Sequence, residues 1–382
     1  MAFHFDIIET NSEFAELHDE WRNLLQKSKI SSPFLTWEWM YSWWICYGEK
    51  QPTNSLCIVT SRDENNLIGI LPGYVTHRRA FGRSGVTFRF LGSEYESSDY
   101  LDVIRKDTDG DLVEDLFKFM IKEKKVDMIA LYNILEGQTV LTAINDLAGT
   151  IDAQMVVKHH RICPYLPLDG DWDSFVSGLS KNQRYNLRRR TRKLFEEFDA
   201  ELSILEDAGE LETAVDELFQ LHEDRFKTKQ EQSIFRADLR KDFHKKVAGY
   251  FLEKNILKLF RLSVENKVIA SLYCYEFANK LFYFQFGMDP EWAKHSPGVV
   301  IMAQAIKYAI EKKLDYFDFM RGDEEYKFKW TDKVRNMVTI DLAVTTKGKQ
   351  MLGLREFGLG LKDSIKTIVP EKVWSTLKEF GK

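Results

Sequence analysis

Three strand-like runs in close succession, between residues 257 and 287, constrain the fold more than any other feature of the sequence. The runs are rich in apolar residues, and the links between them, Glu265-Asn266-Lys267 and Ala278-Asn279-Lys280, are short enough for tight turns. A helical pattern follows at residues 298–313, and then a further strand-like run at residues 316–320. This order predicts an α/β domain with a mixed sheet.

The first half of the chain has the same order of elements in a coarser form. An alternating run at residues 4–8 and an amphipathic helix precede an aromatic-rich segment, PFLTWEWMYSWWICYG, which we predict to be a helix packed into a core rather than a ligand-stacking cluster. Further strand-like runs and one helix follow, at residues 56–61, 67–75, 88–91, 100–104, 112–122 and 128–132. In the second half, helical patterns at residues 180–197, 210–229 and 236–254 and a strand-like run at 202–205 precede the three strands. The shared order predicts two diverged copies of one fold, and two unrelated α/β domains are the alternative.

Chain length and composition agree with two globular domains. The 382 residues allow about two domains of ordinary size, and the 44% hydrophobic and 30% charged residues exclude a disordered chain. We predict an N-terminal domain over residues 1–170, a C-terminal one over 171–345 that carries the chemistry, and a helical tail over 346–382. The net charge of −5 argues against a protein that binds nucleic acid over its whole surface.

The N-terminus and the cysteines bear on where the protein works. The opening MAFHFDIIET has no basic region and no long apolar core, so it does not read as a secretory signal. The longest apolar runs are far shorter than the roughly 20 residues that span a bilayer. The four cysteines form no CxxC pair, and no metal motif is present. These observations predict a cytoplasmic protein that holds no metal.

The strand, loop and helix that begin near residue 281 predict a ligand crevice. Parallel neighbouring strands joined by a helix separate at their carboxyl ends, and open α/β sheets place ligands there. Pro297 and Gly298 suit the first turn of the helix and let a ligand approach the backbone closely. Free N–H groups at that turn favour a phosphate, although an ordinary helix start has the same sequence features.

A charged and aromatic cluster, RGDEEYKFKW at residues 321–330, follows directly on the last of these strand-like runs. Its carboxylates, phenol and amines are candidates for a general acid, a general base and a phosphate clamp beside the crevice. The three aromatic residues alternate with Lys327 and Lys329. We therefore expect an extended segment whose aromatic face is anchored in a core while the two lysines project together. A solvated charged loop is the alternative.

A strongly basic helical segment, SKNQRYNLRRRTRKL, precedes the strands of the second half. It holds seven basic residues between Lys181 and Lys193 and no acidic residue. This composition fits an anionic partner, which could be a phosphate-rich donor, a nucleotide-linked acceptor or RNA. A basic exposed face paired with the acidic run that follows is the alternative. Arg184 and Arg188 fall on one helical face, which predicts a paired anion clamp.

These segments resemble the CelD family of GNAT-like acyltransferases, which is named for cellulose biosynthesis and is related to the FemABX peptidyltransferases. Three elements carry the resemblance: SKNQRYNLRRRTRKL, the strand-turn-helix FQFGMDPEWAKHSPGVVI and the terminal FDFMRGDEEYKFKW. SSPFLTWEWMYSWW and SSDYLDVI in the first half are also similar to this family, so the resemblance covers most of the chain. It implies two tandem GNAT folds, an acyl-CoA such as acetyl-CoA as the donor, and no metal.

The resemblance also implies roles for individual residues. The separated strand that hydrogen-bonds the pantetheine arm of CoA would be formed by Gln285, Phe286, Gly287 and Met288. The pyrophosphate would be received by Ser296, Pro297, Gly298 and Val299. This phosphate loop holds fewer glycines than the ordinary GNAT loop. The acceptor would contact Arg321 and either Lys327 or Lys329, the lysine meeting its phosphate as in the related peptidyltransferases.

Taken together, these features predict acyl transfer to an amine on a sugar or cell-envelope precursor, with a small molecule or a sugar nucleotide as the acceptor. In this hypothesis Asp323 or Glu325 acts as the general base, and Tyr326 protonates the leaving thiolate. Backbone amides near Phe286 and Gly287 polarise the thioester carbonyl. Two alternatives are an aminoacyl-tRNA-dependent transferase, which the basic helix motivates, and a non-catalytic partner in polysaccharide assembly, which the atypical phosphate loop motivates.

Overall fold

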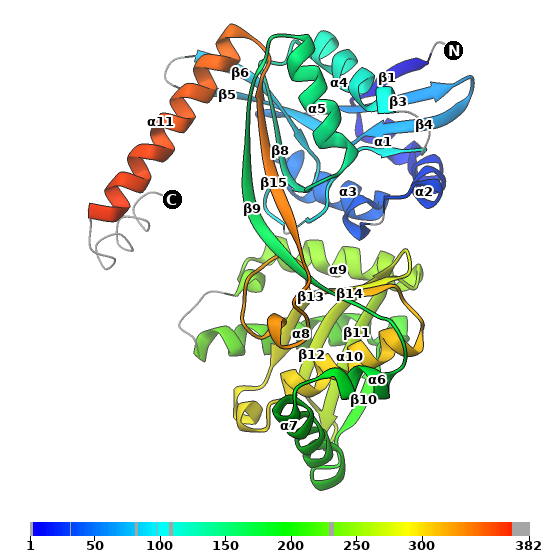
Figure 1. Cartoon of the computed structure of the whole chain (residues 1–382). Helices are drawn as coiled ribbons and strands as arrows, with labels where there is room; N and C mark the ends of the chain where they lie inside the picture. Colours follow the sequence, from blue (N-terminus) through cyan, green and yellow to red (C-terminus); the bar gives the residue numbers. More distant parts are fainter. Residues whose placement is uncertain are drawn as a thin grey trace.

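The chain folds into two lobes that share one continuous β-sheet (Figure 1). The computed structural model describes residues 3–30, 32–80, 83–96, 98–106, 110–228 and 233–368. The strands are β1 His4–Ile8, β2 Asn54–Leu56, β3 Ile58–Asp63, β4 Asn66–Leu71, β5 Gly73–Ala80, β6 Arg83–Phe90, β7 Ile104–Arg105, β8 Met128–Leu135, β9 Gln154–Pro167, β10 Glu201–Ile204, β11 Leu257–Val264, β12 Lys267–Phe277, β13 Lys280–Met288, β14 Tyr316–Asp318 and β15 Val334–Ala343. The α-helices are α1 Asn11–Glu16, α2 His18–Lys27, α3 Trp37–Trp43, α4 Gly110–Lys124, α5 Thr139–Thr150, α6 Trp172–Gly178, α7 Lys181–Arg192, α8 Leu211–Thr228, α9 Asp238–Glu253, α10 Pro297–Glu311 and α11 Thr346–Ile368.

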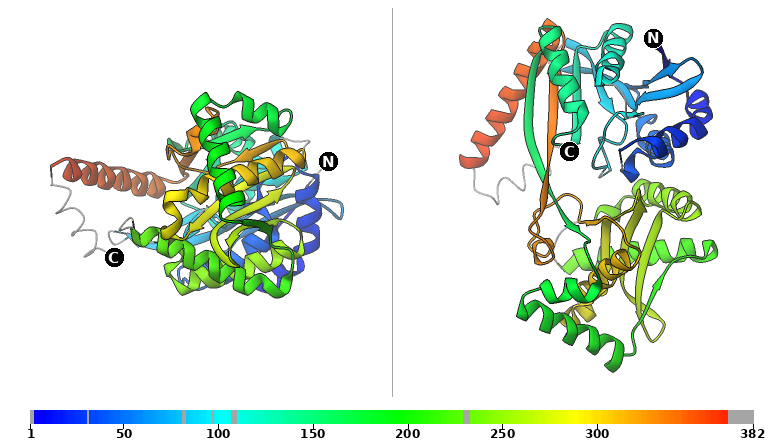
Figure 2. Two further views of the ribbon diagram at one scale, coloured as in Figure 1. Left: turned by 90° about the horizontal axis from the view of Figure 1, so that it is seen from below. Right: turned by 45° about the vertical axis from the view of Figure 1, so that its right-hand side comes forward.

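Two long strands in the middle of the large sheet connect the lobes. The sheet has 11 strands in the order β10-β11-β12-β13-β14-β9-β15-β8-β6-β5-β2, and a separate 4-stranded sheet has the order β1-β3-β4-β7. β9 pairs antiparallel with β15 along most of its length and with β14 at its end, and β15 also pairs with β8. A strand from late in the chain therefore lies between two strands of the first half. The right-hand view of Figure 2 shows both long strands running from one lobe into the other.

The three-stranded meander predicted from the sequence is present. β11, β12 and β13 are consecutive antiparallel neighbours. Their turn residues Glu265, Asn266, Ala278 and Asn279 have φ angles of 50°, 62°, 47° and 60°. Two consecutive residues with positive φ form the hairpin turn that matches the twist of the strands. α10 then carries the chain to β14, which pairs parallel with β13, so the mixed α/β order is confirmed.

The aromatic segment of the first half fills the core of its lobe, as predicted. α3 and the π-helical turn after it bury Trp37, Trp39, Trp43 and Trp44. The Trp39 indole donates a hydrogen bond to Ser98 Oγ at 2.8 Å, and the Trp43 indole donates to the carbonyl of Glu94 at 2.7 Å. These rings therefore contribute their burial energy without leaving an indole N–H unsatisfied.

The sequence-based prediction is wrong at several places. The expected strand at residues 100–104 is a buried irregular segment followed by β7, because Tyr100 has a left-handed backbone with φ 60° that ends an extended run. β14 stops at Asp318 for the same reason, since Met320 has φ 57°. β9, α5 and β15 lie at residues for which the sequence patterns described above predict no element. The tail is helical to Ile368, and residues 369–382 lie outside the described part of the chain.

Candidate active site

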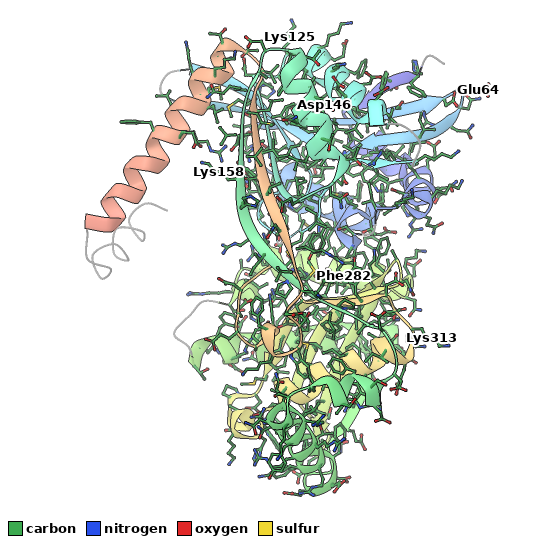
Figure 3. All side chains as sticks on the ribbon, viewed as in Figure 1. Glu64, Lys125, Asp146, Lys158, Phe282 and Lys313 are labelled. Atoms are coloured by element: carbon green, nitrogen blue, oxygen red, sulfur yellow. The ribbon has the colours of Figure 1, made fainter. Side chains whose placement is uncertain are left out.

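The carboxyl end of β13 extends beyond its parallel neighbour. β13 pairs with β14 only from Lys280 to Phe282, close to where the two lobes meet (Figure 3), and it then continues to Met288. A bulge also interrupts the β12–β13 ladder, since Tyr273 faces Gln285 while Cys274 faces Tyr283. The two parallel strands therefore separate as predicted, and bulges of this kind are frequent beside binding sites.

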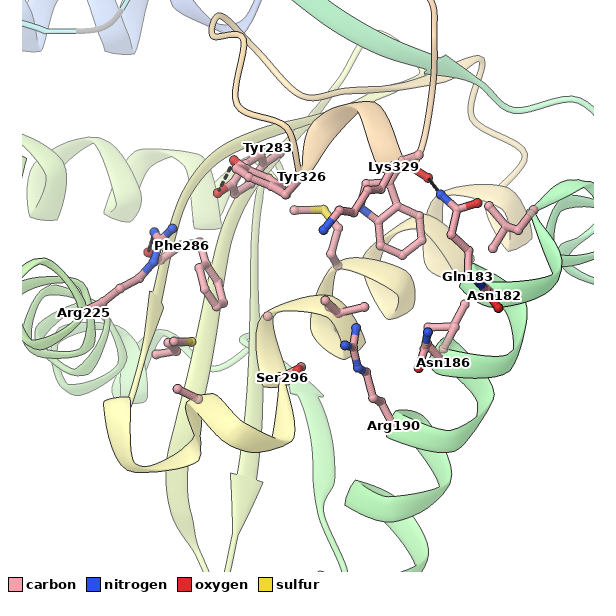
Figure 4. A pocket seen from close by; sticks show the side chains of 18 residues that line it. Asn182, Gln183, Asn186, Arg190, Arg225, Tyr283, Phe286, Ser296, Tyr326 and Lys329 are labelled. Atoms are coloured by element: carbon pink, nitrogen blue, oxygen red, sulfur yellow. Dashed lines mark hydrogen bonds between the residues drawn. The ribbon is translucent and has the colours of Figure 1, made fainter. Parts of the chain in front are cut away.

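A cavity of about 500 Å³, here called the first cavity, opens beside the separated strand (Figure 4). Tyr283 and Tyr326 lie at one end of it, and Ser296, just before α10, and Arg190 of α7 lie toward the other. Apolar side chains line the space between, and they include Leu187, Phe286, Val299, Met302 and Trp330. The first cavity is therefore apolar in its middle and polar at both ends.

The lining of the first cavity is positively charged. Arg190, Arg225 and Lys329 line it, and its lining includes no acidic side chain. Within the part of the chain that the structure describes, none of these three cations has a carboxylate within 4 Å. A ligand that enters this cavity is consequently favoured when it is anionic.

The first turn of α10 lies at the end of the first cavity that is opposite Tyr283 and Tyr326. Pro297 is the first helical residue, and Ser296 before it has φ 57° and makes no side-chain capping hydrogen bond. Gly298 lines the cavity, and a Cβ atom there would come within 2.7 Å of the Phe286 ring. The Val299 N–H already donates to the Ser296 carbonyl at 3.1 Å, so the helix dipole is what favours a negatively charged ligand group at this position.

One polar stripe of α7 faces the first cavity. Asn182, Asn186 and Arg190 are spaced four residues apart and all line it. The predicted pair Arg184 and Arg188 does not line it. Arg184 donates to the carbonyl of Ser177 at 2.6 Å, and Arg188 is exposed. Arg190, and not the expected pair, therefore lines the first cavity.

A second cavity of about 490 Å³ lies on the other side of the two tyrosines. It shares Arg225, Tyr283 and Tyr326 with the first cavity. Its further polar lining residues are Asp99, Gln285, Arg321, Glu324 and Lys327. Four of these form ion pairs, Asp99 with Arg321 at 3.2 Å and Glu324 with Lys327 at 2.9 Å. The second cavity is thus polar and nearly balanced in charge, unlike the first.

Tyr326 stands between the two cavities. Its hydroxyl donates a hydrogen bond to Tyr283 Oη at 3.3 Å. Burial raises the pKa of Tyr326 far above its usual value, and the neighbouring Tyr283 and Glu324 add to the effect. Burial also raises the pKa of Tyr283 to about 12. Both phenols therefore keep their protons at neutral pH, and each can donate one to a developing anion.

The segment at residues 321–330 is not extended, which corrects the prediction. Lys327–Lys329 form a short 3₁₀ turn, in which Lys327 is 3% exposed and Phe328 is 41% exposed. Gly322, with φ 126°, turns the chain back, and Lys327 Nζ donates to the carbonyl of Arg321 at 2.7 Å. As a result the two lysines point apart, Lys327 into the second cavity and Lys329 into the first.

Asp323 and Glu325 lie outside both cavities. Both side chains are exposed, and Asp323 lines a separate surface hollow with His159 and Arg161. Glu324, between them, is the acid of this segment that lines the second cavity. The tight turn at Gly322 decides which of the three consecutive acids faces inward, and residue order alone does not reveal it.

The remaining predicted residues divide between the cavities. Met288, Ser296, Gly298 and Val299 line the first cavity, and Phe286 does so with its ring. Gln285 lines the second, where its Oε1 lies 3.2 Å from His222 Nε2. Pro297 is buried, and Gly287 packs against α8 so closely that a Cβ atom there would lie 2.7 Å from the His222 backbone nitrogen. Gly287 is therefore required by packing.

Sequence reasoning missed Asp99, Arg190 and Arg225 as site residues. Arg225, on α8, donates to the carbonyl of Phe286 at 3.2 Å and lies 5.0 Å from the centre of the Phe286 ring. Asp99 comes from the first half of the chain, and the SSDYLDVI segment that contains it is the one signal that could have drawn attention to it. The position of Arg190 follows from the face that α7 turns toward α10.

Two further properties concern what the described residues do not contain. No helix among residues 3–368, as far as they are described, combines the length and the apolarity that crossing a membrane requires. Within the same described residues, no three His, Cys, Asp or Glu side chains gather in an arrangement that could hold a metal ion.

Comparisons with known proteins agree with this geometry. Residues 181–328 match the family model described as an acetyltransferase (GNAT) domain. Over most of the chain the fold is similar to FemX, with a TM-score of 0.61 at 10% identity, covering 92% of this chain and 99% of that one. It is also similar to a conserved protein of unknown function from Bacteroides thetaiotaomicron, with a TM-score of 0.54 at 10% identity, covering 88% of this chain and 100% of that one. A third similar structure is the C-terminal domain of an Agrobacterium fabrum protein assigned as a lysylphosphatidylglycerol synthetase, with a TM-score of 0.53 at 12% identity, covering 92% and 97%. No curated protein matches the chain in sequence.

The domain match and the separated strands define the class of the protein. Residues 181–328 are a GNAT acetyltransferase domain, and the chain is an enzyme of the acyltransferase class. The likeness to solved structures at these identities shows the fold alone. The more specific resemblance to the CelD family stays a prediction.

Proposed function

We propose that this protein transfers an acyl group from acyl-CoA, acetyl-CoA in the simplest case, to an amine on a sugar or another cell-envelope or polysaccharide precursor. The observation that carries the proposal is the match between the first cavity and the shape of a CoA thioester. Such a donor has an anionic phosphate end, a thin neutral arm and a reactive thioester. The first cavity has an uncapped helix start with Arg190, an apolar middle and a protonated tyrosine, in that order.

Each part of the donor then meets a defined group. The pyrophosphate lies at residues 296–299, beside Arg190. The pantetheine arm passes between Phe286 and Trp330, within reach of the amides of Asn182 and Asn186. The thioester reaches Tyr326, which borders both cavities. In this arrangement the acceptor approaches from the second cavity, on the opposite side of Tyr326.

The chemistry follows from that placement. A neutral amine attacks the thioester carbonyl, so that the C–N bond forms and the C–S bond breaks. Tyr326 gives its proton to the leaving sulfur and regains one from the nitrogen. The general-base role proposed for Asp323 or Glu325 requires an acceptor that extends over the rim of the site, since both carboxylates are exposed. We place this reaction in the cytoplasm, where acyl-CoA is available.

A thermal-shift experiment tests the donor. Acetyl-CoA, a longer acyl-CoA, free CoA and a nucleotide sugar are compared on the wild type, Arg190→Gln and Arg188→Gln. Ligand at about 100 times its Kd stabilises the folded state by about 2.7 kcal/mol. We expect the CoA species to raise the melting temperature of the wild type and of Arg188→Gln, and to raise that of Arg190→Gln less. The absence of a rise with every CoA species would refute the proposal.

An aminoacyl-tRNA-dependent transferase is a second candidate, and one observation favours it. None of the seven basic side chains of residues 181–193 has a carboxylate within 4 Å in the described part of the chain, so the acidic run that follows does not neutralise them. RNA binding would use this uncompensated charge and would weaken steeply with salt. Binding of tRNA that survives neutralisation of Arg188, Arg189 and Arg190 would remove the observation that favours this candidate, and the absence of any tRNA binding would exclude it.

A further inference from the structure

Asp99 is the one carboxylate of the second cavity that comes from the first half of the chain. Its side chain is 1% exposed and lines the cavity. Oδ2 accepts the backbone N–H of Arg321 at 3.3 Å. Oδ1 lies 3.2 Å from Arg321 Nε, but among the described residues it accepts no hydrogen bond. A buried carboxylate oxygen without a hydrogen-bond donor is costly, and a ligand that supplies one removes the cost.

The backbone around Asp99 is held in an uncommon shape that fixes this oxygen. Tyr100 has φ 60°, which is rare for a bulky aromatic residue, and its hydroxyl donates to Asp318 Oδ1 at 2.8 Å. The carbonyl of Asp99 accepts the Ser32 hydroxyl at 3.1 Å. On the opposite side, Met320 has φ 57° immediately before Arg321. Two left-handed residues thus hold the Asp99 carboxylate against Arg321, and strain of this kind concentrates at functional sites.

Two of the three cations that line the second cavity are engaged within the protein, and the third, Arg225, also lines the first cavity. Lys327 Nζ donates to the carbonyls of Met320 and Arg321 and pairs with Glu324. Arg321 donates to Asn133 Oδ1 at 3.4 Å besides pairing with Asp99. Among the described side chains that line this cavity, the buried polar atom without a hydrogen-bond partner is an acceptor, Asp99 Oδ1, and Tyr326 borders the same cavity. An acceptor oxygen selects a ligand that brings N–H donors.

We infer that the second cavity is the acceptor site and that Asp99 is its specificity-determining residue, binding the ammonium or amine group of a primary-amine acceptor. The inference rests on the proposed acyl-transfer function and assigns the residue by which the site would prefer its amine acceptor to an alcohol. It also means that the first half of the chain, which lies outside the matched GNAT domain, contributes directly to the site.

Matched acceptors test the inference. The full chain, with acetyl-CoA, is given glucosamine or glucose, and ethanolamine or ethylene glycol, and release of the CoA thiol is followed. We expect release with the amines and little with the alcohols. Asp99→Asn should lose about tenfold or more in kcat/KM for the amines, the magnitude of one hydrogen bond to a charged group. Asp332→Asn, which removes an exposed carboxylate that lines neither cavity, should behave as the wild type.

Several outcomes would overturn the inference. These are equal turnover of amines by Asp99→Asn and the wild type, or faster turnover of alcohols than of amines by the wild type. If Asp99→Asn melts well below the wild type, Asp99→Glu replaces it. Preference for amines retained in Asp99→Glu supports the inference, and its loss counts against it. Thermal shifts with acetyl-CoA show separately whether the donor proposal fails. If it fails, the amine site is tested by the rise in melting temperature that glucosamine causes. Loss of this rise in Asp99→Asn supports the inference, and an unchanged rise in Asp99→Asn refutes it.

Discussion

Each half of the chain contains a pair of parallel neighbouring strands joined by a helix, yet only one pair opens into a site. In the first half, β6 pairs with β8 up to Arg89 and ends one residue later at Phe90. In the second half, pairing stops at Phe282 and β13 runs on to Met288. The buried indoles of Trp39 and Trp43 pack against the segment that follows β6. Their N–H groups donate hydrogen bonds to Ser98 Oγ and to the carbonyl of Glu94. One topology thus gives a filled core or a cavity, depending on whether a strand extends beyond its partner and what fills the space.

The largest expected effect concerns the filled half. Trp39→Ala should lower the free energy of unfolding by about 3–5 kcal/mol, because it removes a fully buried ring. Denaturant titration measures it, and the stabilisation of the remaining folded protein by acetyl-CoA should be unchanged. A variant of unaltered stability that no longer responds to acetyl-CoA would show that the aromatic segment is a ligand site.

In the open half, Tyr326→Phe should lower kcat for acyl transfer by about 100-fold or more, because it removes the proton donor between the two cavities. Steady-state release of the CoA thiol measures this effect. Stability and the thermal shift with acetyl-CoA should stay near those of the wild type. Unchanged turnover would remove Tyr326 from the mechanism.

A buried imidazole behind β13 makes the open half sensitive to acid. Burial lowers the pKa of His222 to about 4, from an ordinary value of 6.5. The unfolded chain therefore binds a proton between these pH values and the folded chain does not, so stability is present above pH 6.5 and is lost as the pH falls toward 4. The loss attributable to His222 is roughly 3 kcal/mol. His222→Gln should lose less stability than the wild type over this range in urea titrations, and an equal loss would contradict the prediction.

The smallest expected effect is a change in acetyl-CoA affinity on substitution of a glycine, Gly298, with Gly149 as the control. Gly298→Val should weaken acetyl-CoA binding about tenfold, because its side chain would displace the Phe286 ring, and overpacking typically costs about 1–3 kcal/mol. Gly149→Ala, in α5, has nothing within 4 Å of the added Cβ and should leave binding unchanged. Calorimetric titration separates the two variants, and equal affinities would mean that the ring is not part of the donor site.

Local patterns predicted the second half well because most of its strands pair with neighbours in the sequence. The meander depends on turn residues such as Asn266 and Asn279, and the separated strand follows from the order of strand and helix. Contacts between distant segments could not be predicted in this way. β15 pairs with strands from residues 128–167, and Asp99 meets Arg321 across more than 200 positions of sequence.

The same distinction between local patterns and tertiary contacts applies to the site residues. Ser296 and Gly298, which we predict to receive a phosphate, belong to one local motif, and both line the first cavity. The inward residue among Asp323, Glu324 and Glu325 depends on the left-handed backbone near Gly322, which no periodicity records. The α7 arginine that faces the cavity is Arg190, two residues and about half a helical turn beyond Arg188. The packing of α7 on α10 sets which face of the helix is turned to the cavity, and the sequence does not record it.

The position of β15 has a consequence for synthesis on the ribosome. β8 and β9 are complete once residue 167 has emerged, but the strand that belongs between them is made only when residue 343 has followed. Until then the nascent first half has two unpaired strand edges, which are templates for pairing with other chains. The first half therefore cannot complete its sheet before almost the whole polypeptide is present. A chain that ends between residues 167 and 343 leaves an aggregation-prone fragment, which chaperones and proteases must then remove.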